Sequence, residues 1–590
     1  MNSFKSGVHK LSWKTFFTDK EESEKNEWTK ILIKVKKAMN LEKLQCPIES
    51  VLFSENFVNR STAYLIKSQI HNDNVHTYLL NELNSFLTTY EVKIIQSDKN
   101  AGLVICYVKD YENEILRQLN DLNTYIPSTM TQFNMDMDRF TDIARNNINT
   151  LFSEADKKKL KSLIPREYKP AKFYILPKVH KKYDNFPVGR PISSTIQVIN
   201  RTFSMILDAI LRPLCICIPN LIIDSTHLLF LLGNLNLDPN RKYFMLASDI
   251  QSMYQELPID ACKNSCIKFF LENKTKVNFP IPISVQQLKS LLNLSLDYSY
   301  LEYKKELFFQ RRGIQMGNCA SVSVANITAE IELRDLWKPE MIFIGRYIDD
   351  IFTILDVTDL QISVEDWIKT NYVHNFLKFT HETSDKAVNF LDIHISIDNH
   401  NVLNTSLYEK EVSRHEYLHF YSNHPRHMIN SLPYSCGLRV IRTCSDLEDT
   451  KNKLSKMFNK FRRRQYPESL LLQVNNRLQS INRNELIKPT SNLHFSHISM
   501  HYPDILNLNL NNVKRKENTN TKDIYLVFPF FSSPALKQKI NMLFLNEVKK
   551  CRSTYLKSIV LDLNINVAFT IPNQVGRLIA GIEKRKEQPK

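Results

Sequence analysis

Glycine is scarce in this sequence: only 10 of the 590 residues are glycine, where average usage of about 7% would give roughly 40. We therefore expect the remaining glycines at places where the backbone does not accept a Cβ atom. Long apolar runs are also missing, since residues 228–232 are far too few to span a membrane. The first residues lack the apolar core of a signal peptide, so we expect no association with a membrane.

The ten cysteines are scattered and form no pair of CxxC motifs of the zinc-binding kind. They predict reduced thiols in an intracellular protein. The net charge of +16 and the pI of about 9.1 indicate a polyanionic partner, nucleic acid first and an anionic membrane surface second. An apolar content of 43% is globular, and the length favours about two to four domains.

Two adjacent carboxylates, Asp349 and Asp350, lie between two apolar, β-prone runs in residues 343–355. The pattern predicts strand, tight turn and strand, with both acids at the tip. Paired acids are costly in an apolar setting unless a cation offsets them, and Mg²⁺ prefers carboxylate oxygens. A plain hairpin with aspartates in its turn explains this stretch equally well when it is taken alone.

Two basic loops precede the acids. Lys99 lies in a polar turn between strand-like runs in residues 94–107, and Lys178 lies between the strand-like runs of residues 173–194. Arg190 opens the second of those runs and is held extended by Pro191. Cations in such turns suit a triphosphate, although ordinary surface loops have the same pattern.

Asp249 ends an apolar strand predicted over residues 243–250, where functional residues often collect; a helix cap is the alternative role. Gly313 and Gly317 then flank a short loop that contains Met316 and leads into a helix. A glycine loop of this kind lets the backbone lie close to a ligand.

In this order, the features resemble the boxes of reverse transcriptases, and most of all those of Penelope-like retroelements, relatives of telomerase reverse transcriptase. The resemblance runs from about residue 90 to about residue 580, and its ordered set is more specific than any single box. The residues that carry it are Asp98-Lys99-Asn100-Ala101-Gly102, Leu176-Pro177-Lys178-Val179-His180-Lys181, Arg190-Pro191-Ile192, Ser248-Asp249-Ile250-Gln251-Ser252-Met253-Tyr254, Gln315-Met316-Gly317, Tyr347-Ile348-Asp349-Asp350, Asn389-Phe390-Leu391-Asp392-Ile393, His419-Phe420-Tyr421-Ser422-Asn423-His424-Pro425 and Leu438-Arg439-Val440-Ile441-Arg442-Thr443-Cys444-Ser445.

The resemblance implies an α+β right-hand polymerase with fingers, a palm with an antiparallel sheet, and a helical thumb. We expect a helical N-terminal region over residues 1–90, fingers and palm over 91–395, and a thumb or helix-rich nucleic-acid-binding region over 396–590. Residues 111–165 and 200–235 are expected to be helical. The GIY and YIG motifs of the nuclease that many such elements carry are missing from the sequence. The resemblance is therefore to the branch without that domain, to a truncated copy or to a domesticated enzyme.

The resemblance also implies a metal site. Asp249 and Asp349 would be the main ligands of two Mg²⁺ ions, with Mn²⁺ as an alternative, while Asp350 assists and the carbonyl of Ile250 completes the shell. Lys378, or alternatively Lys386, would protonate the leaving pyrophosphate, as a general acid.

The nucleotide would be bound by several of the other boxes. Arg190, with Lys178 or Lys99, would bind the triphosphate. Tyr254 would exclude a ribose 2′-hydroxyl by its bulk, and the loop of Met316 and Gly317 would back the incoming nucleotide.

The implied activity is RNA-directed DNA synthesis, with an RNA template, a DNA primer and dNTPs as partners, in the nucleus. The basic residues of the thumb, among them Arg439 and Arg442, are expected to contact phosphates of the duplex. The run from Lys460 to Arg464 fits a nuclear localisation signal, a face that follows the duplex, or simply a solvated helix face. Two other functions stay open: a catalytically silent nucleic-acid-binding protein on the same scaffold, and a cellular polymerase with a telomerase-like role.

Overall fold

The computed structural model describes residues 77–100, 102–151, 168–195, 198, 200–279, 283–409, 417–422, 424 and 426–487, residues 542 and 546, and strands at 522–529 and 563–570. The chain divides into two units, one of Met1–Thr88, Leu418–Leu432 and Val513–Lys590, and one of Thr89–Tyr417 and Pro433–Asn512. Most of the predicted N-terminal region lies outside the described residues, which contain its helix α4 (Thr77–Thr89). The predicted domain boundaries stay a prediction.

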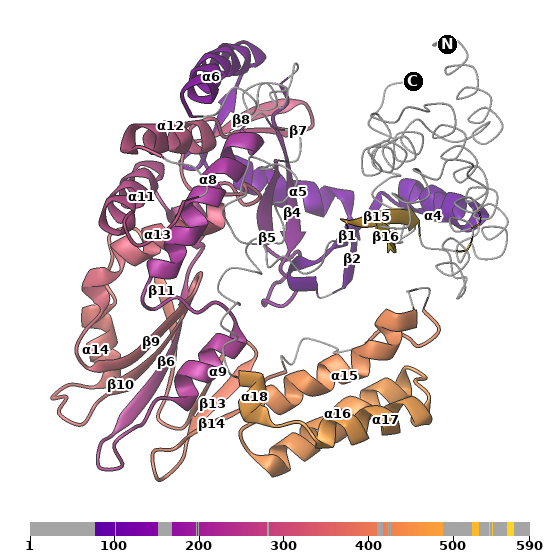
Figure 1. Cartoon of the computed structure of the whole chain (residues 1–590). Coiled ribbons are helices and arrows are strands. Elements are labelled where there is room, and N and C mark those ends of the chain that lie inside the picture. Colours follow the sequence, from indigo (N-terminus) through magenta and orange to yellow (C-terminus); the bar gives the residue numbers. More distant parts are fainter. Residues whose placement is uncertain are drawn as a thin grey trace. The chain divides into compact units, whose positions relative to one another are not determined.

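The larger unit contains a four-stranded antiparallel sheet (Figure 1). Its strand order is β11-β6-β10-β9, with the bounds Phe379–Ser384, Tyr243–Ile250, Asp350–Asp356 and Met341–Tyr347. β9 and β10 are joined by only two residues, Ile348 and Asp349. The prediction of strand, tight turn and strand is therefore confirmed, with Asp349 in the turn and Asp350 at the start of β10.

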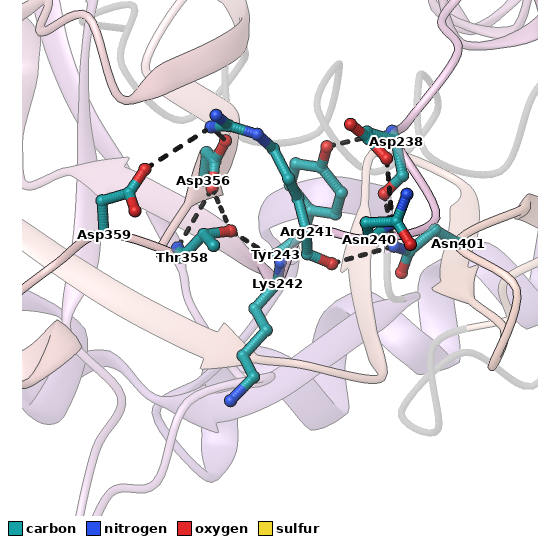
Figure 2. A network of polar contacts seen from close by, with 9 residues as sticks. All are labelled: Asp238, Asn240, Arg241, Lys242, Tyr243, Asp356, Thr358, Asp359 and Asn401. Carbon is teal, nitrogen blue, oxygen red and sulfur yellow. Dashed lines mark hydrogen bonds and ion pairs between the residues drawn. The ribbon is translucent and has the colours of Figure 1, made fainter.

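A polar network closes the end of β6 and β10 that is remote from this turn (Figure 2). Arg241 forms an ion pair with Asp356, and the backbone N–H of Lys242 donates to Thr358 Oγ1 at 2.9 Å. The side-chain amide of Asn401 donates to the carbonyl of Arg241 at 2.9 Å. Because a slip of one residue would turn every side chain to the other face of the sheet, these contacts help to maintain the register of the two strands.

Each face of the sheet is covered by its own apolar cluster. On one face, Ile250 and Ile351 join a large core with helices α6 (Met130–Leu151), α8 (Arg201–Leu214), α11 (Ile259–Asn273), α12 (Val285–Leu296) and α13 (Ser321–Glu332). Farther along the same face, Leu246 and Leu355 pack on Trp367 of α14 (Val364–Asn371). The opposite face packs Met245, Phe352 and Ile354 against α9 (Ser225–Gly233) and against β12 and β13.

A five-stranded sheet with the order β3-β8-β7-β4-β5 belongs to the same unit. Its bounds are Tyr125–Ser128, Glu306–Gln310, Tyr300–Tyr303, Ala171–Pro177 and Gly189–Ser194. β4, β7 and β8 pack with α5 (Val108–Leu119) and with the hairpin of β1 (Val92–Gln96) and β2 (Leu103–Tyr107). β3 interrupts residues 111–165, so the prediction of an all-helical segment there is wrong.

Residues 426–487 are mostly helical. A three-stranded sheet of β12 (Ala387–Phe390), β13 (Ile393–Ile397) and β14 (Leu403–Leu407) precedes them. The helices are α15 (Arg426–Thr443), α16 (Leu447–Arg463), α17 (Glu468–Gln479) and α18 (Arg483–Ile487). A parallel pair, β15 (Lys522–Pro529) and β16 (Leu563–Thr570), lies in the smaller unit.

The short helices are α10 (Met253–Glu256) and the 3₁₀ turns Asp98–Asn100, Cys215–Cys217 and Arg334–Leu336. Nowhere in the described part of the chain is a helix both long and apolar enough to cross a membrane. The described residues confirm the α+β class, with an antiparallel palm sheet followed by thumb helices.

Candidate active site

The three aspartates singled out in the sequence meet at one end of the palm sheet. Asp249 on β6 lies directly opposite Asp350 on β10 in the antiparallel register, and directly opposed residues point to the same face of a sheet. The backbone N–H of Ile250 donates to the carbonyl of Asp349 at 2.9 Å. Two segments about 100 residues apart in the sequence thus bring their carboxylates together.

The turn that carries Asp349 has an unusual backbone. Ile348 has a φ of 57°, a left-handed conformation that β-branched residues rarely adopt and that costs roughly 1–3 kcal/mol. The guanidinium of Arg346 donates to the carbonyl of Ile348 at 3.0 Å, and to the side chain and carbonyl of Asn326 on α13 at 3.0 and 2.8 Å. Arg346 is only 1% exposed, so a buried cation connects the turn to a core helix.

Burial raises the pKa of the Asp349 carboxyl, and the nearby charge of Asp249 raises it further, whereas Arg190 and Lys99 lower it. A carboxyl whose ionisation is opposed by burial and by a neighbouring acid is one whose charged form a divalent cation stabilises. As they stand, no three histidine, cysteine, aspartate or glutamate side chains of the described residues are grouped to bind a metal. The donors are nevertheless carboxylate oxygens from two adjoining strands, so their chemistry fits Mg²⁺ or Mn²⁺.

Cationic side chains face these acids from the hairpins β1–β2 and β4–β5. Arg190 on β5 donates its Nε to Asp98 Oδ1 at 2.9 Å, and its side chain is 32% exposed. Lys99 follows Asp98 in a turn with a φ of 56°. Burial lowers the pKa of Lys178, and the charge of Arg190 contributes to the same shift. The three predicted phosphate-binding cations therefore form one cluster.

Tyr254 lies close to both Asp349 and Arg190. Burial raises its pKa to about 12, with the charge of Asp349 adding to the shift and that of Arg190 opposing it. Its helix α10 begins after Ser252, which has a φ of 49°, so the chain turns sharply after Asp249. The predicted sugar-discriminating residue thus lies near both the carboxylates and the arginine.

The glycine loop packs against β5 and against the turn that carries Tyr254. Gly313 has a φ of 79° and Gly317 a φ of 130°, and a Cβ on Gly317 would lie 2.2 Å from the carbonyl oxygen of Ser193. The carbonyl of Met316 accepts from the N–H of Ser193 at 2.9 Å. The expectation that glycines mark places without room for a Cβ holds at both positions, but not at Gly233, where the space is open.

Lys378 comes directly before β11, and its carbonyl accepts from the N–H of Gln251 at 2.8 Å. This contact places its backbone at the edge of the site, while its side chain is exposed. Its role as a proton donor stays a prediction.

Several basic residues of the thumb contact acids of the protein itself. Arg439 donates to Asp392 Oδ2 at 2.9 and 2.6 Å, and Lys460 contacts both oxygens of Glu409 at 2.8 and 2.7 Å. Arg439 thus has an acidic partner within the protein, and its expected contact with a phosphate of the duplex stays a prediction. The run that begins at Lys460 is likewise partly used within the protein.

Sequence reasoning assigned no role to two residues that shape the site. Asp98 is only 4% exposed, and it orients Arg190 by accepting a hydrogen bond from its Nε. Arg346 was read as part of an apolar strand. The signal for Arg346 was a lone arginine in that run, because a buried cation requires partners.

Comparison with known proteins gave one family match, to a model described as the animal helix-turn-helix domain, over residues 416–474. This segment includes α15, α16 and the first part of α17. The sequence matches none of the curated proteins.

Several solved structures are similar to this chain. Telomerase from Candida albicans, in complex with a fragment of telomeric RNA, is 11% identical over 82% of this chain and 75% of that chain, with a TM-score of 0.44. Apo telomerase from Candida tropicalis, truncated from its C-terminal domain, is 13% identical over 53% of this chain and 63% of that chain, with a TM-score of 0.36.

The RNA-dependent RNA polymerase of BmCPV in its elongation state is 11% identical over 62% of this chain and 34% of that chain, with a TM-score of 0.33. The chain thus spans less than two thirds of the truncated telomerase and about a third of the viral enzyme. At such low identities and scores, the function has to be argued from the site itself.

Proposed function

We propose that this chain is an RNA-directed DNA polymerase of the Penelope-like kind, which extends a DNA primer on an RNA template by nucleotidyl transfer. One observation carries the proposal. Asp249 pairs in register with Asp350, beside Asp349, and the charges of Arg190 and Lys99 act on the carboxyl of Asp349. Opposed acids next to a cationic cluster suit a reaction that joins a hydroxyl to a triphosphate. The net charge of +16 suits the nucleic-acid partners.

In this mechanism, Asp249, Asp349 and Asp350 would hold two divalent cations, Mg²⁺ or Mn²⁺, and the carbonyl of Ile250 would be a further donor. The bound cations would lower the pKa of the primer 3′-hydroxyl and neutralise charge on the phosphates. Arg346 keeps the turn of Asp349 in place through its bond to the Ile348 carbonyl.

The nucleotide is bound by the residues opposite the acids. Arg190, oriented by Asp98, binds the triphosphate together with Lys178 and Lys99. Tyr254 excludes the 2′-hydroxyl of a ribonucleotide, and Lys378 protonates the pyrophosphate as it leaves. The protein acts in the nucleus in this proposal.

The match of residues 416–474 to a helix-turn-helix model favours one other candidate. Helix-turn-helix units commonly bind DNA, so the chain could bind nucleic acid without catalysis. This candidate predicts binding that does not depend on Asp349.

Extension of a labelled DNA primer by the full-length protein tests both functions. The proposed function predicts dNTP incorporation on an RNA template in the presence of Mg²⁺, and loss of incorporation in Asp349→Ala with template binding retained. Binding of the primed RNA by the wild-type protein without any incorporation supports the silent nucleic-acid-binding protein and contradicts the polymerase. Extension only with ribonucleotides would contradict the assignment to DNA synthesis.

A further inference from the structure

The turn that carries Tyr254 is attached to the glycine loop by three contacts. The N–H of Ile314 donates to the carbonyl of Tyr254 at 2.7 Å. Arg312 Nη2 forms an ion pair with Glu256 Oε2 at 2.6 Å. A Cβ on Gly313 would lie 2.6 Å from the carbonyl oxygen of Tyr254, so the two backbones are in direct contact.

The same loop contacts β5 at its other end. Thr195 Oγ1 donates to the carbonyl of Gly317 at 2.6 Å, and Ser193 donates its N–H to the carbonyl of Met316 at 2.9 Å. Since Arg190 lies on β5, one loop connects the strand of the triphosphate cation with the turn of Tyr254. A shift of the loop would therefore change the distance between Arg190 and Tyr254.

The three contacts differ in how easily a substitution can remove them. The backbone hydrogen bond and the close approach of Gly313 cannot be altered by a substitution alone, because a φ of 79° and the lack of space allow only glycine at this position. The ion pair joins two side chains that are 41% and 32% exposed, and such pairs contribute modestly and depend on salt. The pair of Arg312 and Glu256 is thus the contact that can be removed without rebuilding the backbone.

We propose that Arg312 and Glu256 are positioning residues that set how strictly Tyr254 rejects ribonucleotides. The proposal rests on the proposed polymerase function and adds to it two residues that touch no nucleotide. Tyr254 excludes a 2′-hydroxyl only while its turn stays pressed toward the nucleotide. Without the pair, the turn is displaced more often, and each displacement admits a ribonucleotide.

The size of the effect has an upper bound. A lost contact can raise the population of the displaced turn only by the factor that corresponds to its own free energy. For an exposed ion pair this factor is roughly two- to fivefold. Discrimination should therefore fall by about two- to fivefold, much less than in Tyr254→Val, where the bulky ring itself is gone.

Single-nucleotide incorporation by the full-length protein tests this, with kcat/KM measured for a dNTP and for the matching rNTP. Glu256→Gln and Arg312→Gln should each lower the ratio of the two values, and the exchange Glu256→Arg with Arg312→Glu should restore it. The matched control is Glu272→Gln, which breaks the pair of Glu272 with Arg334, whose side chains are both 35% exposed and lie 2.9 Å apart.

The outcomes distinguish a failure of the positioning role from a failure of the polymerase function. A ratio that is unchanged in Glu256→Gln but falls in Tyr254→Val would overturn the inference and leave the polymerase intact. An unchanged ratio in Tyr254→Val would remove the premise about Tyr254. A wild-type protein without any incorporation would refute the proposed function itself. A drop in Glu272→Gln equal to that in Glu256→Gln would show a general loss of stability and contradict a role in positioning.

Discussion

Replacement of Arg346 by methionine should release the turn that carries Asp349. Methionine keeps the unbranched apolar stem of the side chain, although it is shorter, and donates none of the three hydrogen bonds of the guanidinium. The strained φ of 57° at Ile348 would then lose the contact to its carbonyl. Because strain of this kind relaxes when its support is removed, Asp349 should move away from Asp249.

The magnitude follows from two opposing terms. Each buried acceptor left without a partner costs about 1–3 kcal/mol, and the carbonyls of Ile348 and Asn326 and the Asn326 side chain all lose their donor. Burial also lowers the pKa of Arg346 to about 10 from 12.5, and removal of this unfavourable charge returns about 3 kcal/mol. The three costs less this return leave roughly 0–6 kcal/mol. We expect a net destabilisation near the middle of this range, about 3 kcal/mol, which is the lower end for the loss of one partner from a buried ionic contact.

Urea unfolding followed by tryptophan fluorescence measures the stability, since Trp367 is 3% exposed beneath the palm sheet. Primer extension measures the activity, which should fall far more than the folded fraction does. Arg241→Met is the matched control: it removes the exposed partner of Asp356 at the other end of β10 and should lower the stability far less than Arg346→Met does.

A second substitution separates loss of the turn from loss of the fold. Ile348→Gly, added to Arg346→Met, places a residue that adopts positive φ without strain, so part of the activity should return while the stability does not. Full activity in Arg346→Met alone, or no recovery in the double variant, would refute the role of this arginine in positioning Asp349.

Two other predictions concern the glycine loop and the cationic cluster. Gly317→Ala forces a Cβ to 2.2 Å from the Ser193 carbonyl oxygen and should cost more than about 2 kcal/mol in urea unfolding, whereas Gly233→Ala, with open space, should change stability by less than about 1 kcal/mol; equal effects would contradict the packing. Burial and the charge of Arg190 lower the pKa of Lys178 from 10.5, so Lys178 loses its charge at a lower pH than an ordinary lysine. The KM for dNTP should rise over the pH range in which this charge is lost. Arg190→Gln should move that rise to higher pH, and a rise at an unchanged pH would mean that Arg190 does not act on Lys178.

The local pattern sufficed for the elements that carry the acids. The apolar runs around Asp349 and before Asp249 alternate as strands do, and the pairing of their ends follows once both belong to one sheet. The glycine loop could also be read locally, because a residue type that is scarce elsewhere marks a backbone constraint.

The contacts between distant segments could not be read in this way. Asp98 and Arg190 are separated by 92 positions, and no periodicity reveals which acid an arginine will meet. The thumb shows the same limit: Arg439 has the charge of a phosphate-binding residue, but the palm supplies it with Asp392. The strand β3 was missed because its four residues, Tyr125–Ser128, are too few for an alternating pattern.

The most direct test of the central claim is to map where a metal ion binds along the chain. Fe²⁺ with ascorbate and peroxide cleaves the backbone beside the residues that hold the ion, and Fe²⁺ competes for oxygen sites that also bind Mg²⁺. The account predicts cleavage of the full-length protein at two places, next to Asp249 and next to Asp349, with protection by Mg²⁺ and loss of both cuts in Asp349→Ala. Cleavage at only one of these places, or at sites that Asp349→Ala leaves unchanged, would contradict a shared metal site at the end of the palm sheet.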